Sequence, residues 1–211
     1  MTKVIPLLVF LLALAISCAA QSGRRMAAPP PPPPAPPVVE TTEAPAERMS
    51  PSTVESGVLP DGLLNRDLKS LDSGSFKLSD FAGKVIVVNL WASWCGPCRA
   101  EIPDYEKVRK EYAGRPVEFI GLTTEDPRSA SDRVRKFVRD VSFGFRLGWA
   151  DHQTARTLMD GHNVIPQTIV LSRDGHIISH WRGYARGQSR DHLRDVISRA
   201  LADVNTSALK Q

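Results

Sequence analysis

The sequence predicts an α/β domain with a central mixed β-sheet flanked by helices. Strand-like and helix-like stretches alternate along most of the chain. The run from Val85 to Trp91 is apolar except at Asn89, which is typical of a strand buried on both faces. Near the C-terminus, two strand-like stretches joined by Ser-Arg-Asp-Gly form a hairpin followed by an amphipathic helix, so part of the sheet is antiparallel.

The individual elements follow from periodicity and turn residues. A short β-hairpin with its turn at 72–75 comes first, as an addition at the N-terminal end of the domain. The expected strands after it are 84–91, 116–123, 145–150, 167–171 and 176–181. The expected helices are 95–112, 129–141, 153–159 and 189–204.

The N-terminus has the order of features of an export leader. Lys3 is followed by the apolar run 5–16 and then by small residues, and the run is too short to span a bilayer comfortably. We therefore predict a signal peptide at 1–20. Its end, Leu-Ala-Ile-Ser-Cys, resembles the lipobox of bacterial lipoproteins, which implies a lipidated Cys18 and a lipid anchor on the periplasmic or extracytoplasmic side. Ordinary cleavage after Ala19 or Ala20 is the alternative.

Residues 21–60 cannot build a core and are expected to form a disordered linker. The segment 29–37 contains eight prolines and one alanine. Such a segment adopts extended polyproline II, with about 3.1 Å per residue, and suits a spacer between a membrane and a domain. A proline-rich ligand for a partner domain is the alternative. The folded domain is then expected at 61–205, with a tail at 206–211.

Composition disfavours two other classes of protein. The formal net charge is only +4, and no basic run is interleaved with aromatic residues, so nucleic-acid binding is not expected. Without Cys18, the chain keeps two cysteines, and its five histidines lack the spacing of zinc ligands. No metal site is predicted.

The remaining cysteines, Cys95 and Cys98, form a CxxC motif between a buried strand and a helix. At the first turn of a helix, free N–H groups and the helix dipole favour a thiolate at Cys95. Cys98 lies close enough to resolve a mixed disulfide formed there. Pro97 suits a first helical turn, and Gly96 leaves room for an approaching chain. An inert structural disulfide is the alternative, although so small a loop gains little stability from closure.

The string WASWCGPCRAEIP at 91–103 resembles the active-site segment of the TlpA/ResA-like, membrane-associated branch of the thioredoxin superfamily. The resemblance extends over about 63–204 and implies a thioredoxin-like fold and thiol–disulfide exchange by Cys95 and Cys98, with no cofactor besides that disulfide. It also implies a cis bond at Pro166, in a loop where Ile165 and Pro166 bind substrate. Trp94 is expected to cover the disulfide from one side.

The chain departs from the family pattern at two positions, Asn89 and Val164. Cytosolic thioredoxins have a buried Asp where this chain has Asn89, so proton transfer to or from Cys98 needs another group. The resemblance suggests Glu125 for this role. Glu101 is expected to be an exposed helix residue. Val164 stands where many relatives have a glycine, which leaves substrate preference open.

The resemblance implies a reductase for disulfides of exported proteins, for example in cytochrome c maturation, with electrons from a membrane thiol donor. We expect a monomer whose partners are thiols and disulfides of cell-envelope proteins. Three alternatives stay open at this point: a peptide-binding or chaperone module, a peroxiredoxin-like peroxidase and a structural envelope protein. The peroxidase is disfavoured because Ser93 and the paired cysteines do not fit its pattern.

Overall fold

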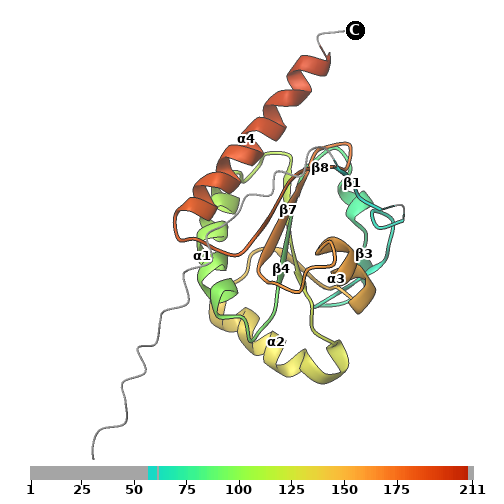
Figure 1. Ribbon diagram of the computed structural model, residues 1–211, viewed down its shortest axis with the longest axis vertical. Coiled ribbons are helices and arrows are strands. Elements are labelled where there is room, and N and C mark those ends of the chain that lie inside the picture. The colour runs from blue at the N-terminus through green and yellow to red at the C-terminus, as the bar shows by residue number, and fades with distance from the viewer. Residues whose placement is uncertain (1–56, 61, 209–211) are drawn as a thin grey trace, which may run out of the picture. The chain divides into compact units, whose positions relative to one another are not determined.

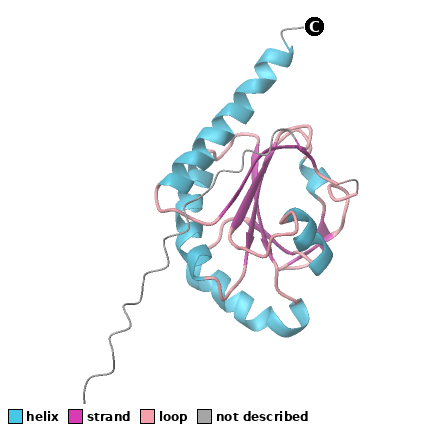
Figure 2. Ribbon diagram, in the orientation of Figure 1, coloured by secondary structure: helices cyan, strands magenta, loops and turns pink. Residues whose placement is uncertain are grey.

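Helices cover both faces of one mixed β-sheet in the computed structural model, which describes residues 57–60 and 62–208 (Figures 1 and 2). The strands are β1 (Gly57–Val58), β2 (Leu68–Ser70), β3 (Ser75–Phe76), β4 (Val85–Trp91), β5 (Val117–Thr123), β6 (Arg146–Trp149), β7 (Gln167–Leu171) and β8 (His176–Arg182). The helices are α1 (Gly96–Glu111), α2 (Pro127–Val141), α3 (His152–Leu158), α4 (Gln188–Ala208) and the 3₁₀ helix η1 (Leu78–Phe81).

The sheet has the strand order β1-β8-β7-β4-β5-β6-β2-β3, so β4 lies near its middle. β4 runs parallel to β5, and β5 runs parallel to β6, whereas β7 is antiparallel to β4. The predicted hairpins are both present, as β2–β3 and β7–β8. All seven residues of β4 are buried, as the apolar run predicts.

Side chains of β4 alternate between two cores because successive residues of a strand point to opposite faces. Val85 and Val87 pack with residues of α1 and α4. Ile86, Val88 and Leu90 pack with α3 and with the segment that precedes β4. Asn89 falls on the α1 face and is the polar exception in this strand. The buried polar side chain of Asn89 therefore lies on the same face of the sheet as α1, the helix that carries Cys98.

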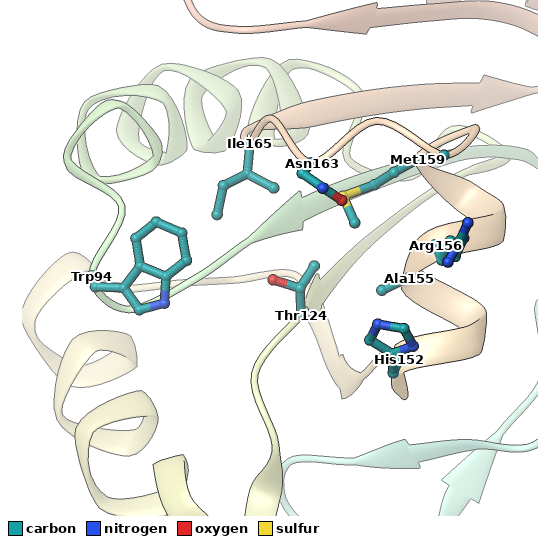
Figure 3. A pocket seen from close by; sticks show the side chains of 9 residues that line it. Trp94, Thr124, His152, Ala155, Arg156, Met159, Asn163 and Ile165 are labelled. Carbon is teal, nitrogen blue, oxygen red and sulfur yellow. The ribbon is translucent and has the colours of Figure 1, made fainter.

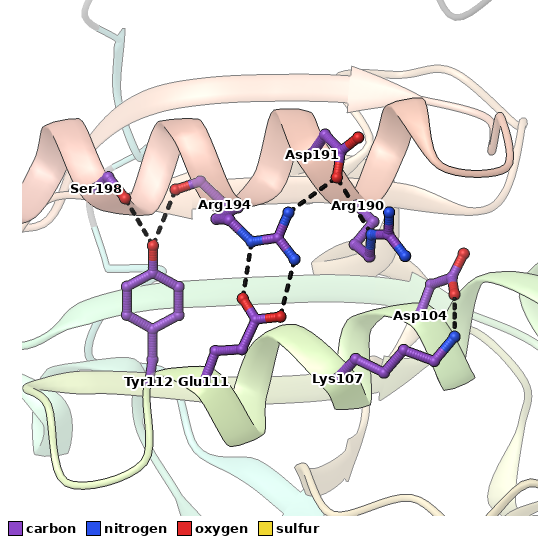
Figure 4. Close-up of polar contacts among 8 residues, drawn as sticks. All are labelled: Asp104, Lys107, Glu111, Tyr112, Arg190, Asp191, Arg194 and Ser198. Atoms are coloured by element: carbon purple, nitrogen blue, oxygen red, sulfur yellow. Dashed lines mark hydrogen bonds and ion pairs between the residues drawn. The ribbon is translucent and has the colours of Figure 1, made fainter.

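Helix α4 is joined to α1 by polar contacts as well as by apolar packing (Figure 4). Arg194 donates two hydrogen bonds to the Glu111 carboxylate, at 2.7 and 2.8 Å. The Tyr112 hydroxyl donates to the carbonyl of Arg194 at 3.0 Å and lies 2.7 Å from the hydroxyl of Ser198. These contacts fix the end of α1 opposite to the cysteines, because they lie in its last turn.

Two elements of the structure extend past the predicted boundaries of the domain. β1 pairs with β8 at Gly57 and Val58, inside the range assigned to the linker. A two-residue edge strand is held by backbone pairing and has no hydrophobic period to detect. At the other end, α4 continues through Ala208, into the range assigned to the tail. Residues 1–56, with the expected leader, Cys18 and most of the linker, lie outside the described residues.

Candidate active site

Cys95 and Cys98 form a disulfide at the start of α1, directly after the central strand β4. Cys95 is the residue that caps the helix, and it is 4% exposed, whereas Cys98 is fully buried. Gly96 and Pro97 between them are exposed, and a side chain at Gly96 would meet open space. Cys95 is therefore the more exposed of the two cysteines.

The first turn of α1 stabilises negative charge at Cys95. The backbone N–H of Cys98 points at Cys95 Sγ over 3.2 Å, in the position of a cap hydrogen bond. Free N–H groups and the positive end of the helix dipole favour a thiolate at such a position. Pro97 removes no hydrogen bond there because N–H groups of the first turn have no partner within the helix. The local geometry therefore agrees with the nucleophilic role predicted for Cys95.

The loop before β7 lies against the disulfide. The Ile165–Pro166 bond is cis, as the sequence resemblance implied. The Ile165 carbonyl oxygen lies 3.8 Å from Cys95 Sγ. The Pro166 carbonyl accepts a hydrogen bond from the backbone N–H of Gly183 at 2.8 Å, which ties the loop to the end of β8. Backbone groups of this loop are thus available beside the reactive sulfur.

The buried side chains of Gln167 and His180 hold the loop before β7 in place through hydrogen bonds. The Gln167 amide donates to the carbonyl of Val164 at 2.7 Å, and its oxygen lies 2.7 Å from His180 Nε2. Since that amide oxygen can only accept, His180 Nε2 carries the proton. Burial, with the nearby Arg182 charge, lowers the pKa of His180 below its ordinary value, so the ring is neutral at pH 7. Sequence patterns gave no hint of this pair, because its two residues lie on neighbouring strands.

Replacing Gln167 with alanine should raise the KM for disulfide peptides several-fold without changing the reduction potential of the Cys95–Cys98 couple. The substitution leaves the buried ring of His180 without a partner, so stability should also fall by about 1–3 kcal/mol. Steady-state kinetics and glutathione equilibration measure the first two quantities. Gln188→Ala, at an exposed glutamine, is the matched control. An unchanged KM would mean that the Gly183 contact alone holds the loop.

Glu101 is the buried carboxyl nearest in sequence to the cysteines, and the expectation that it is exposed is wrong. It lies one helical turn after Cys98 and is fully buried. Its Oε2 accepts a hydrogen bond of 2.7 Å from the Asn89 amide, while Oε1 has no hydrogen-bond partner. Burial raises the pKa of Glu101 to about 8, against smaller opposing effects of Asn89 and Tyr105. A carboxyl with such a pKa can exchange a proton near neutral pH.

The side chain of Glu125 contacts Ser93 and Arg133. Its Oε2 accepts from the backbone N–H of Ser93 at 2.6 Å, and its Oε1 accepts from the Ser93 hydroxyl at 3.0 Å. Arg133 adds an ion pair at 2.7 Å. This carboxylate therefore fixes the segment that leads from β4 to Cys95. The proton-acceptor role predicted for Glu125 stays a prediction, and the buried Glu101 is a second candidate for it.

The two tryptophans of the motif have opposite surroundings. Trp91 is fully buried and stacks on Phe137 with ring centroids 5.1 Å apart, as expected for a core residue. Trp94 is 68% exposed beside Cys95, so it offers its indole ring to solvent. Val164, which precedes the cis Ile165–Pro166 bond, is also exposed, so apolar side chains face solvent on both segments beside the disulfide.

Few proteins place a CxxC disulfide at the start of a helix opposite a cis-proline loop, and with this sheet order the combination defines the thioredoxin superfamily. A sequence model described as Redoxin matches residues 44–197, well over half of the 211 residues. The chain therefore belongs to the Redoxin family.

Individual relatives agree with this assignment. The chain is 37% identical over 80 residues to the thioredoxin-like protein YneN of Bacillus subtilis, which covers 38% of this chain and 46% of the relative. It is 32% identical over 120 residues to the thiol-disulfide oxidoreductase ResA of Oceanobacillus iheyensis, with 56% and 59% coverage. The chain thus spans about half the length of these two relatives.

Among solved structures, a protein from Chlorobium tepidum assigned as a thiol:disulfide interchange protein DsbE superposes with a TM-score of 0.59. Its sequence is 25% identical, and the match covers 69% of this chain and 96% of that one. The predicted thioredoxin-like fold and the resemblance to ResA-like proteins are confirmed.

Proposed function

We propose that the protein is a thiol–disulfide oxidoreductase that acts through Cys95 and Cys98. The observation that carries this proposal is the Cys95–Cys98 disulfide, in which the slightly exposed Cys95 lies beside the cis-proline loop. The names of the ResA and DsbE relatives support the same activity. The Cys95–Cys98 pair itself carries the two electrons, as two thiols when reduced and as a disulfide when oxidised, so the proposed reaction needs no further cofactor.

In the reducing direction, the Cys95 thiolate attacks one sulfur of a target disulfide and the other target sulfur leaves as a thiolate. The Cys98 thiol then loses its proton and attacks Cys95 Sγ. This step releases the second target sulfur and regenerates the Cys95–Cys98 disulfide, so one disulfide is reduced as another forms. Glu101, one turn from Cys98, is the group that we assign to hold and return the Cys98 proton.

An insulin-reduction assay with dithiothreitol tests the activity. The wild type should accelerate precipitation of the insulin B chain, and Cys95→Ser should react no faster than dithiothreitol alone. Equal rates for the two proteins would refute the proposal and favour a peptide-binding module. We propose reduction as the physiological direction because CGPC resembles the motif of reducing members of the superfamily. A reduction potential well above the range of thioredoxins, about −270 mV, would instead identify an oxidase.

We further propose that the protein works outside the cytoplasm as a monomer and reduces exported proteins, apocytochrome c among them, with electrons from a membrane thiol donor. The leader-like N-terminus and the resemblance to the ResA-like branch support this location. Within the described residues, no helix is both long enough and apolar enough to cross a membrane. The lipobox-like sequence that ends at Cys18 supports attachment to the membrane through a lipid on that residue.

Lipidation predicts a particular mature N-terminus. The intact mass of protein extracted from membranes should correspond to a chain that starts at Cys18 and carries acyl groups. A Cys18→Ser variant should lose the acyl mass and leave the membrane fraction. A mature chain that starts at Ala20 or Gln21 would contradict the lipid anchor.

A further inference from the structure

A pocket of about 330 Å³ adjoins the disulfide on the side of α3 (Figure 3). Trp94 and Ile165 line the end near the cysteines, and His152 and Arg156 project from α3 at the other end, with Thr124 and Asn163 between them. Trp94 precedes Cys95 in the chain, and the Ile165 carbonyl lies 3.8 Å from Cys95 Sγ. A polypeptide held at Cys95 therefore has its neighbouring side chains within reach of this pocket.

The polar side chains of the pocket are unoccupied by internal contacts. Among the described residues, none hydrogen-bonds or ion-pairs with the side chains of Thr124, His152, Arg156 or Asn163. Asp151, at the start of α3, differs from these four residues because its side chain has partners within the protein. Its carboxylate accepts from the Thr154 N–H at 2.7 Å and lies 3.7 Å from Arg66. The pocket thus keeps donors free while a neighbouring acid is engaged elsewhere.

The charge of the pocket selects the kind of group that fits. Arg156 is its one permanently charged lining residue, and no acidic side chain lines it. A guanidinium binds a carboxylate through paired N–H donors, and imidazole, amide and hydroxyl groups can add further hydrogen bonds. Trp94 and Ile165 supply an apolar wall on which the methylene groups of a side chain can pack.

We propose that this pocket is a specificity subsite for an acidic side chain, Asp or Glu, that flanks the reducible cysteine of a substrate polypeptide. The proposal rests on the proposed thiol–disulfide exchange at Cys95. It names a substrate property, the charge of a side chain beside the cysteine, that the exchange chemistry of Cys95 and Cys98 does not itself determine. Arg156 is the residue on which the preference depends.

A matched pair of disulfide peptides tests the subsite, one with Glu beside the reactive cysteine and one with Gln at the same position. For the wild type, kcat/KM should be about fivefold higher for the Glu peptide, the size expected of an exposed ion pair. Raising the salt concentration to 0.5 M should reduce this ratio. Arg156→Gln should bring the ratio close to one. Arg135→Gln removes the same charge from an exposed position on α2 and should leave the ratio unchanged.

A binding measurement separates failure of the subsite from failure of the proposed activity. Cysteine-free versions of both peptides are titrated into the oxidised protein by calorimetry. Tighter binding of the Glu peptide that Arg156→Gln abolishes supports the subsite even if no peptide is reduced. Equal binding of the two peptides, or a ratio that Arg156→Gln and Arg135→Gln change alike, overturns it whether or not insulin is reduced.

Discussion

Cys98→Ser should convert the protein into a trap that stays covalently bound to its target. Cys95 is the capping residue with slight exposure, so it can still attack a disulfide. Without the buried Cys98 sulfur, nothing on the first turn of α1 can resolve the mixed disulfide. Turnover should fall to the rate of dithiothreitol alone, while a protein–target adduct accumulates. Non-reducing electrophoresis and intact mass measurement identify the adduct.

The order of the two sulfurs is tested by the reciprocal variant. Cys95→Ser should be equally inactive in turnover but should form no adduct, because its remaining thiol is fully buried. The double variant Cys95→Ser/Cys98→Ser provides the background for both. An adduct on Cys95→Ser and none on Cys98→Ser would reverse the assigned roles. If neither single variant formed an adduct, the Cys95–Cys98 bond would be an inert structural disulfide.

Most of the fold could be predicted because its strongest patterns are local. The apolar run of β4 and the turn residues of the β7–β8 hairpin each identify an element without knowledge of the rest. The CxxC motif likewise predicts where helix α1 begins. The edge strand β1 could not be predicted, since its position depends on β8, far along the chain.

The site was less predictable because its polar residues depend on which face of α1 is buried. Glu101 belongs to the stripe that includes Cys98, Tyr105 and Val108, spaced by three or four residues, and this spacing predicts burial. Charge alone suggested an exposed residue. Glu125 was assigned from its position after β5, which places it near the motif but does not say that Ser93 and Arg133 engage its carboxylate.

Asn89 and Glu101 form a buried pair in which only Glu101 can titrate. Asn89 lies on the α1 face of β4 and donates to Glu101 over 2.7 Å, so it supports a carboxyl without having one to titrate. The titratable group of this pair therefore lies on α1, one turn after Cys98, and not on β4. Loss of an acidic residue in β4 therefore need not remove proton transfer from this side of the disulfide.

Glu101→Gln should abolish a pH dependence of stability that the wild type shows between about pH 5 and pH 8. The pKa of Glu101 is raised from 4.5 to about 8, so below pH 4.5 both folded and unfolded chains hold the proton and its burial costs nothing extra. Between these values only the folded chain holds it, and the free energy of unfolding falls by about 1.4 kcal/mol per pH unit. Above pH 8 the loss is complete. Urea denaturation of the oxidised protein at several pH values measures the slope.

The glutamine variant keeps an acceptor for the Asn89 amide and cannot ionise, so it should match the wild type near pH 4.5 and exceed its stability at pH 8. In the reduced protein, the same variant should shift the titration of the Cys98 thiol, followed by alkylation rates. Glu125→Gln is the matched control, because it makes the same chemical change at a carboxylate that is paired with Arg133. It should lower stability by about 1–3 kcal/mol without removing the slope. If Glu125→Gln shifts the Cys98 titration and Glu101→Gln does not, the proton acceptor is Glu125 after all.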